Sequence, residues 1–217
     1  MTLTPLQIST IVLLSAAMNR LAATRKGVAT RDALLDHAYA IAAAQGLEGL
    51  SLGELARVAG MSKSGVFAHF GSREDLQLAV LDHAAQRFTD EVLVPALRAK
   101  RGRARLRAIF VGWLDWVRDN RDGCPILSAT VEYDGRPGIL RERIVALQTR
   151  WRSELCRAVR MTIDAGELPP DSDAAQIGFE LFGLVLAYHH DARLFEIEPA
   201  ARHALRAFDR LLGCPVS

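Results

Sequence analysis

Residues 51–70, SLGELARVAGMSKSGVFAHF, limit the possible folds of this chain more than any other stretch. Ser51 is a good N-cap for a first helix, and Gly60 supplies the positive φ that a sharp corner after that helix requires. The small side chain of Ala56 allows two helices to come close, and Val66 can insert between them. Because these positions are sterically restricted, the pattern predicts two short helices that meet at a tight corner.

The second helix of this corner has an unusual first turn, in which Lys63 and Ser64 precede Gly65. Glycine inside a helix costs about 1 kcal/mol relative to alanine, so a helix that only packs has no evident use for it. A glycine lets the backbone approach a major groove, where Lys63 can donate to a guanine or a phosphate and Phe67 can contact a thymine methyl group. This composition favours DNA binding, whereas the corner alone is equally compatible with a structural bend in a helical bundle.

The remaining pattern is helical throughout. Apolar residues recur at helical spacing after Thr30, a candidate N-cap, and this helix is expected to stop at Gly46. Ser72 caps a further helix that continues to Phe88. The later helical patterns are separated by segments rich in Gly, Pro or Asp and cover residues 106–117, 125–133, 138–165, 174–195 and 199–212. No alternating apolar and polar run predicts a strand.

Residues 31–88, and above all the stretch RDALLDHAYAIAAAQGLEGLSLGELARVAGMSKSGVFAHFGSREDL, resemble the N-terminal DNA-binding domain of the TetR family of bacterial transcriptional regulators. The signals of that family occur here in its order and at its spacing, while the rest of the chain is similar only in being helical and of suitable length. The resemblance implies a sequence-specific DNA-binding transcriptional regulator. Members are typically homodimeric repressors that bind a palindromic operator in double-stranded DNA and are released by a small-molecule effector.

The same resemblance implies which residues contact DNA. Lys63 and Gly65 match the base-reading start of the family's third helix, and Phe67 matches its usual tyrosine. Since phenylalanine has no hydroxyl, Phe67 cannot make the phosphate hydrogen bond that a tyrosine makes. Amides at helix starts can also bind phosphates. The expected DNA-binding residues, within and just after residues 51–70, are Ser51, Ser62, Lys63, Ser64, Gly65, Phe67, His69 and Arg73.

The expected fold is therefore all-α, with an N-terminal three-helix helix-turn-helix domain followed by a larger helical ligand-binding and dimerisation bundle. We place the helix-turn-helix domain at residues 28–88 and the C-terminal domain at residues 89–217. Residues 1–27 form an extension ahead of both, which is expected to be disordered or to lie partly outside the native start. Met18 is an alternative start of translation within this extension.

The overall charge neither supports nor excludes DNA binding, because the formal net charge is only +2. Arg20, Arg25, Lys26 and Arg31 precede the corner and form either a solvated tail or an arm that neutralises phosphates. A second basic run, at residues 98–107, is expected to be solvated surface. In the architecture of the family, the helix before this run leads away from the DNA.

Large apolar residues in the C-terminal half have two interpretations. Each one alone is most simply a core residue. Together they can line an effector pocket between helices, and the pocket residues that we predict are Phe110, Trp113, Trp116, Phe179 and Phe182. The last two helices are expected to form a four-helix bundle with a second copy about a two-fold axis, through Ile177, Leu181, Leu184, Val185, Leu205, Phe208 and Leu212.

Enzymatic and metal-binding functions have no support in the sequence. The motifs G-x-S-x-G, G-x-x-x-x-G-K-[ST], H-E-x-x-H and G-x-G-x-x-G do not occur. His189 and His190 are adjacent, and adjacent residues on a helix point about 100° apart, which disfavours chelation. The cysteines are too widely spaced for a zinc motif or a disulfide framework. We therefore expect no catalysis, no cofactor and no metal.

A cytoplasmic location without a membrane partner is expected. The apolar run at residues 8–17 has no positive charge before it and is shorter than the roughly 20 apolar residues that span a bilayer. Two rival functions stay open from the residues alone. One is a helical ligand-binding protein that no longer reads DNA, and the other is a membrane-associated helical protein, suggested only by residues 8–17.

Overall fold

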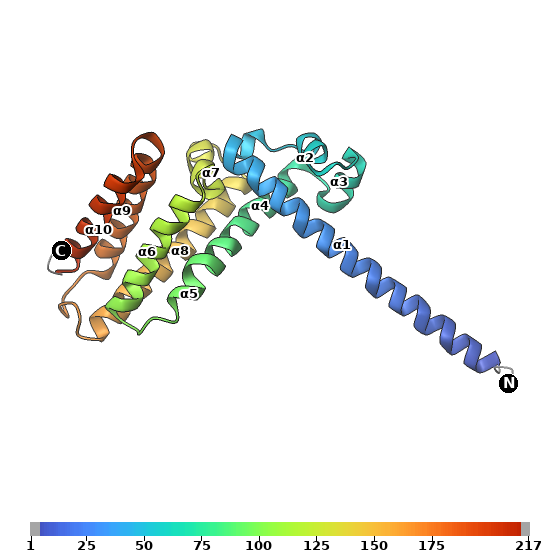
Figure 1. Cartoon of the computed structure of the whole chain (residues 1–217), viewed down its shortest axis with the longest axis horizontal. Helices are drawn as coiled ribbons and strands as arrows, with labels where there is room; N and C mark the ends of the chain where they lie inside the picture. Colours follow the sequence, from blue (N-terminus) through green and yellow to red (C-terminus); the bar gives the residue numbers. More distant parts are fainter. Residues whose placement is uncertain (1–4, 214–217) are drawn as a thin grey trace.

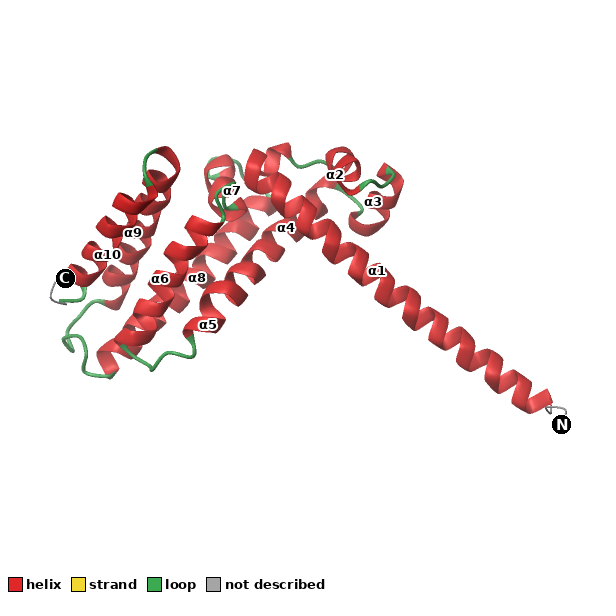
Figure 2. Ribbon diagram, in the orientation of Figure 1, coloured by secondary structure: helices red, strands yellow, loops and turns green. Residues whose placement is uncertain are grey.

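A computed structural model describes the backbone of residues 5–213 and the side chains of residues 27–213. The described residues contain helices and no strand, which confirms the predicted fold class (Figure 2). In Figure 1, α2 and α3 pack beside α1 at one end of the body, and the pair α9 and α10 lies at the other end. The elements are α1 (Pro5–Gly49), α2 (Leu52–Ala59), α3 (Lys63–Phe70), α4 (Arg73–Phe88), the π-helical turn η1 (Thr89–Leu93), α5 (Val94–Ala96), α6 (Arg103–Asp119), α7 (Pro125–Tyr133), α8 (Ile139–Asp164), α9 (Ala174–Leu194) and α10 (Ile197–Leu211).

The first helix begins much earlier than the sequence predicts. Thr30 was expected as its N-cap, but α1 starts at Pro5 and Thr30 lies inside it. No proline follows before Thr30, so every residue there keeps the N–H donor that a helix uses. Gly46, with φ 76° and ψ 172°, interrupts the helix where a stop was expected. The apolar run at residues 8–17 and the basic residues at 20–26 lie outside the described side chains.

The core of the helix-turn-helix part includes residues from the C-terminal part of the chain. Leu55, Val66 and Leu76 are fully buried, as their helical spacing indicates. The same cluster of buried side chains includes Tyr133 of α7 and Ile144 of α8. Because this core crosses residue 88, the two parts of the chain pack directly on each other, and the division at that residue stays a prediction. Among the described residues, no helix is both long and apolar enough for a bilayer crossing.

A second core lies among α6, α8, α9 and α10, and it corrects part of the predicted dimer surface. Four of the predicted residues are at most 2% exposed within one protomer: Leu181, Val185, Phe208 and Leu212. Ile177, Leu184 and Leu205 are partly buried and pack against the same core. The apolar stripe of an amphipathic helix faces the core of its own subunit first, so the four buried residues face their own protomer, while the three partly buried ones stay predicted dimer contacts.

Candidate DNA interface and ligand cavity

The predicted corner between α2 and α3 is present. The Ser51 hydroxyl accepts a hydrogen bond from the Glu54 amide at 3.1 Å, and Gly60 ends α2 in the left-handed conformation, with φ 63° and ψ 30°. The Met61 amide donates to the Ala56 carbonyl at 3.0 Å, which closes the turn. The Glu54 carboxylate binds Arg57 at 2.6 Å. The local sequence therefore builds the corner through backbone caps.

The helix α3 presents a polar row to solvent. Ser62 caps it by accepting from the Gly65 amide at 3.1 Å, and Val66 and Phe70 anchor its other face in the core. Lys63 and Ser64 are exposed, and so is Phe67, at 55% of its surface. A large aromatic side chain that stays exposed beside a lysine and a serine is suited to contact with a base or a sugar. The structure thus brings these predicted residues to one surface at the start of α3.

The absence of a side chain at Gly65 matters for packing inside the protein as well as for the proposed approach to DNA. A Cβ atom at this position would lie 3.2 Å from Ser62 Oγ and 3.3 Å from Met61 Cε. Both neighbours are side-chain ends that would have to give way slightly, and one of them is the cap of α3. The glycine therefore protects the N-terminal cap, a contribution that its helical cost alone did not reveal.

The side chain of Arg73 is exposed and contacts the connection between α1 and α2 at the surface. Its Nε donates to the Leu50 carbonyl at 2.9 Å, and its Nη2 lies 3.2 Å from a carboxylate oxygen of Glu48. These bonds tie the start of α4 to the connection between α1 and α2. The guanidinium is therefore engaged with this connection, and the contact of Arg73 with a phosphate stays a prediction. His69 is half-buried, with its ring 6.5 Å from that of Phe70.

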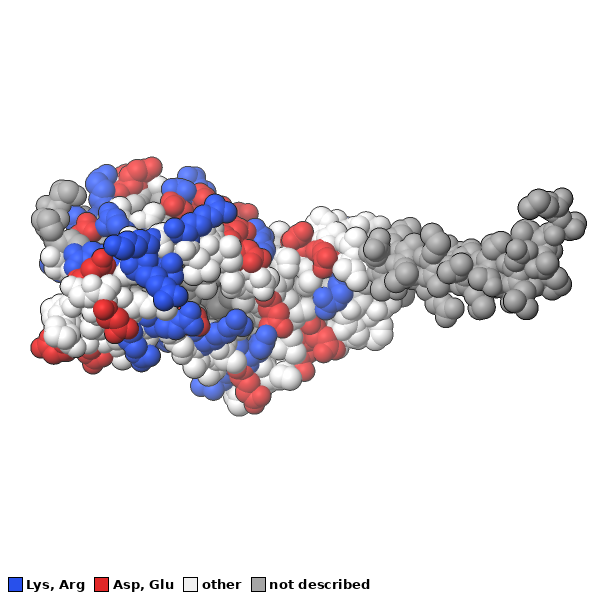
Figure 3. Space-filling view, turned by 90° about the horizontal axis from the view of Figure 1, so that it is seen from below, with Lys and Arg blue, Asp and Glu red and all other residues white. Residues whose placement is uncertain are grey.

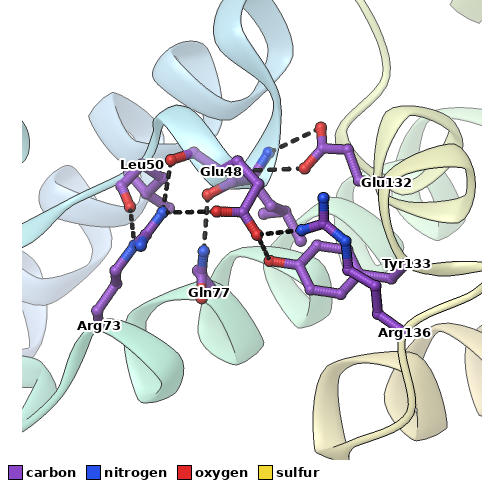
Figure 4. A network of polar contacts seen from close by, with 8 residues as sticks. Glu48, Leu50, Arg73, Gln77, Glu132, Tyr133 and Arg136 are labelled. Carbon is purple, nitrogen blue, oxygen red and sulfur yellow. Dashed lines mark hydrogen bonds and ion pairs between the residues drawn. The ribbon is translucent and has the colours of Figure 1, made fainter.

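The end of α7 holds the same connection from the other side (Figure 4). The two carboxylate oxygens of Glu132 accept from the amides of Leu47 and Glu48 at 3.2 and 3.0 Å. The Tyr133 hydroxyl donates to Glu48 at 2.8 Å, and Arg136 forms an ion pair with the same carboxylate. We call Glu48, Glu132, Tyr133 and Arg136 the α7 clamp. Its partners are more than 80 positions apart in sequence, so no local pattern predicted it.

The α7 clamp shifts the pKa values of its members. The hydrogen bond from Tyr133 is the main cause that holds the pKa of the Glu48 carboxyl below its usual range, with help from Arg73 and Arg136. Burial and then the bond to Glu48 raise the pKa of Tyr133 to about 12. Both shifts favour the state in which a neutral tyrosine donates to a charged carboxylate.

The basic run at residues 98–107 covers the connection between α5 and α6 and the first turns of α6, far from α3 (Figure 1). Arg105 donates to the carbonyl of Leu97 at 3.1 Å and to that of Ala99 at 2.9 Å. Arg107 pairs with Asp209 of α10. Figure 3, seen from below, shows a band of Lys and Arg side chains across the C-terminal part of the molecule. The place of this run agrees with the expectation that it is not part of the DNA surface.

A cavity of about 360 Å³ lies among α4, η1, α6, α7, α8 and α9. Three predicted pocket residues line it: Trp113, Trp116 and Phe182. Two others do not. Phe110 stacks on Phe208 with ring centroids 4.5 Å apart, within the core between α6 and α10. Phe179 is 63% exposed on the outer face of α9. Phe110 and Phe179 are therefore corrections to the predicted pocket.

Sequence reasoning missed two aromatic residues of this cavity. Phe88 comes from the end of α4 and Trp151 from the middle of α8, and their ring centroids are 4.9 Å apart. In the sequence analysis, Phe88 marked only the end of the helix that Ser72 caps. Trp151 stands between Arg150 and Arg152, and a lone tryptophan among arginines on a long helix is a signal that was available in the sequence.

The outer face of α9 carries apolar residues that the protomer leaves exposed. Phe179, Gly183 and Leu186 are spaced four and three residues apart, so they share one face of the helix. Phe179 is 63% exposed and Leu186 is 41% exposed. A Cβ atom added at Gly183 would have no neighbouring atom of the described residues within 4 Å. This face is distinct from the inward stripe of α9, which the sequence analysis had selected.

Two family models match most of the chain. The model described as bacterial regulatory proteins, tetR family, matches residues 34–80. The model described as tetracyclin repressor-like, C-terminal domain, matches residues 102–208. The first covers the end of α1, all of α2 and α3 and the first half of α4, and the second runs from the start of α6 into α10.

Individual relatives agree with these matches. The HTH-type transcriptional regulator SrpR of Pseudomonas putida is 28% identical over 147 residues, which are 66% of this chain and 66% of that protein. The crystal structure of a TetR transcriptional regulator from Chloroflexus aurantiacus is 28% identical, with a TM-score of 0.73 over 87% of this chain and 95% of that one. SCO4454, a TetR-family regulator from Streptomyces coelicolor, is 22% identical, with a TM-score of 0.74 over 85% and 94% of the two chains.

Proposed function

Because the chain belongs to the TetR family of DNA-binding transcriptional regulators, we propose that it is a homodimeric repressor whose operator is released when a small molecule fills the cavity. The family is one of regulators and not of enzymes, and it binds operator DNA. Beyond this family membership, we propose the residues that contact DNA, the dimer surface and the way in which the cavity acts on DNA binding.

The exposed start of α3 is the proposed base-reading surface. Lys63 and Ser64 offer donors to base edges, and Phe67 offers an apolar face to a thymine methyl group or a sugar. The amides at the starts of α2 and α3, after Ser51 and Ser62, are suited to phosphates. His69 is placed at the edge of this surface. Arg73 stays a predicted phosphate contact, and its guanidinium is also engaged with Glu48 and Leu50.

The exposed face of α9 is the proposed dimer surface. Phe179 and Leu186 provide apolar area, and Gly183 between them permits a second helix to come close. An isologous contact of this face with its own copy, joined by α10, would form a four-helix bundle. A two-fold axis of this kind places two α3 helices about 34 Å apart, in successive major grooves.

One observation carries the proposed response to an effector, and it is the position of α7. The start of this helix lines the cavity through Ile126 and Leu127. Its end holds the connection before α2 through Glu132 and Tyr133. A ligand that shifts the start of α7 therefore acts on the position of α2 and α3, and only a difference in affinity for the two arrangements is needed.

Lys63→Ala tests the DNA surface. In gel-shift titrations with the DNA upstream of the protein's own gene, we expect the wild type to bind in a salt-sensitive, sequence-selective way. Loss of a lysine contact to a base should weaken binding on the order of tenfold and relax specificity at one position.

Arg101→Ala is the matched control, since it removes one exposed positive charge from the distant basic run. It should leave operator affinity unchanged. Equal losses in the two variants would contradict the choice of surface. A rise in expression of a reporter under the operator when the protein is deleted supports repression, and a fall would reverse the sign of regulation.

A further inference from the structure

All three tryptophans of the chain line the cavity, and two phenylalanines complete a wall of five rings. Neighbouring rings meet edge to face, with centroids 4.8 to 5.8 Å apart. Walls of this kind provide large apolar contact areas on rigid side chains. A cavity of this volume is within the range of small-molecule sites. Its interior is therefore suited to a flat apolar or aromatic group.

Two of these rings carry donors that need an acceptor. The buried Nε1 atom of Trp151 makes no hydrogen bond within the described part of the chain, and that of Trp116 has no partner other than the nearby thiol of Cys124. The thiol of Cys124 lies beside Trp116 but is a weak acceptor. Buried donors in folded proteins are nearly always paired. An oxygen atom on a ligand, met by a small rotation of either ring, would supply the acceptor.

The residues that line the cavity include two acids, Asp82 and Glu154, and two arginines, Arg143 and Arg150. Asp82 is paired with Arg143 at 2.5 Å, and Glu154 lies 3.5 Å from Arg157. Arg150 also lines the cavity and is exposed, and it has no carboxylate partner among the described residues. Because Asp82 and Glu154 each have another arginine as their partner, the guanidinium of Arg150 is left without an ion pair among the described residues.

A second guanidinium lies close to the same wall. Arg152 stands over the ring of Phe182, with its Cζ 4.0 Å from the ring centroid. It has no ion pair among the described side chains either. On another side, Arg87 lies 6.0 Å from the ring of Trp116. Neither arginine lines the cavity, and Arg87 is paired with Glu91, so Arg152 is the one of the two that adds an unpaired positive charge close to the wall, where it disfavours a cationic ligand.

We propose that the cavity binds an amphipathic anion, a small molecule with a flat apolar body and one acidic group such as a carboxylate or a sulfonate. The body lies among the five rings, and the acidic group binds the guanidinium of Arg150 in a charge-assisted hydrogen bond. The inference rests on the proposed function in treating this cavity as the effector site, and it adds the chemical class of the effector.

Two probes that share an apolar body separate the roles of body and charge. The first is 1-anilinonaphthalene-8-sulfonate, and the second is N-phenyl-1-naphthylamine, which is the same body without the sulfonate. Because every tryptophan of the chain lines the cavity, energy transfer from tryptophan reports a probe bound in or near it, and a loss of sulfonate binding in an Arg150 variant assigns the probe to this site. We expect the wild-type dimer to bind the sulfonate about tenfold more tightly than the neutral probe.

Arg150→Glu is the decisive variant, and Arg160→Glu is its matched control. Both reverse the charge of an exposed arginine on α8, but Arg160 does not line the cavity. Arg150→Glu should weaken binding of the sulfonate about tenfold or more and leave the neutral probe within about twofold. Arg160→Glu should change neither. Circular dichroism checks that both variants keep their helices.

Three outcomes would overturn the inference. They are equal affinity of the wild type for the two probes, equal effects of the two charge reversals, and no energy transfer to the sulfonate at all. None of these measurements uses DNA. Probe binding as expected, in a protein that selects no DNA sequence, would overturn the proposed function and leave this assignment of ligand chemistry standing.

Discussion

Gly46 and Gly60 both have positive φ, but the space around them differs. A Cβ atom on Gly46 would lie 2.0 Å from the Oε1 atom of Glu132. A Cβ atom on Gly60 would have no neighbouring atom of the described residues within 4 Å. A side chain at Gly60 therefore meets only backbone strain, whereas one at Gly46 must also displace the carboxylate that caps the amides of Leu47 and Glu48.

This difference predicts the stability of two alanine variants. Gly60→Ala should lower the free energy of unfolding by roughly 1 to 2 kcal/mol, the cost of a left-handed alanine. Gly46→Ala should cost more, because the hydrogen bonds of Glu132 are lost as well. Urea unfolding followed by circular dichroism measures both. A Gly46→Ala variant as stable as Gly60→Ala would show that Glu132 makes no contribution to stability.

At the scale of the element, α7 is short but has two functions in this structure. Its first turn contributes to the cavity, and its last turn supplies Glu132 and Tyr133 to the α7 clamp. The hydroxyl of Tyr133 is the main reason that the pKa of Glu48 lies below its ordinary value of 4.5. A carboxylate with a lowered folded-state pKa stabilises the protein above that ordinary value, and the stabilisation is lost as the pH falls through the folded-state pKa.

Tyr133→Phe is therefore expected to have a pH-dependent effect. Near neutral pH it should lower the free energy of unfolding by about 1 kcal/mol, since the hydrogen bond to a partly exposed carboxylate is screened by water. The difference from the wild type should shrink as the pH falls below the ordinary value of 4.5 and through the lowered pKa of Glu48 in the folded state. Thermal unfolding across pH 3 to 7 measures it.

A Glu48→Gln background provides the control for this effect. There, Tyr133→Phe should have the same effect at every pH, because the titrating group is absent. A pH-independent difference in the wild-type background would contradict the assignment of the shift to Tyr133.

At the scale of the whole molecule, the apolar outer face of α9 predicts a dimer. Gly183→Arg places a long charged side chain at the centre of this face, where the structure leaves open space. In light scattering coupled to size exclusion, we expect the variant to be a monomer. It should also lose most operator affinity, since one α3 helix cannot use both half-sites.

Gly135→Arg is the control for this prediction. Gly135 is exposed in the connection between α7 and α8, also in open space, and is away from α9. This variant should remain a dimer and bind the operator normally. Dimers of both variants would show that α9 does not form the interface.

The sequence by itself determined the helices and the corner, because these depend on neighbours within a few positions. Ser51, Gly60 and Val66 act through local caps, a local φ and a local packing contact, and the structure agrees on all three. The start of α1 was not determined in this way, since a good cap at Thr30 does not prevent a helix from continuing through it.

Only the tertiary structure decided the roles of residues that face distant partners. Arg73 reads locally as a phosphate contact, and its partners lie 23 and 25 positions earlier in the chain. The two faces of α9 are both apolar, so helical spacing alone did not show which one turns inward. The five rings of the cavity come from α4, α6, α8 and α9, and only their packing brings Phe88 and Trp151 to the same place. Secondary structure follows from local hydrogen bonding and sterics, whereas the site depends on contacts between residues that the sequence keeps far apart.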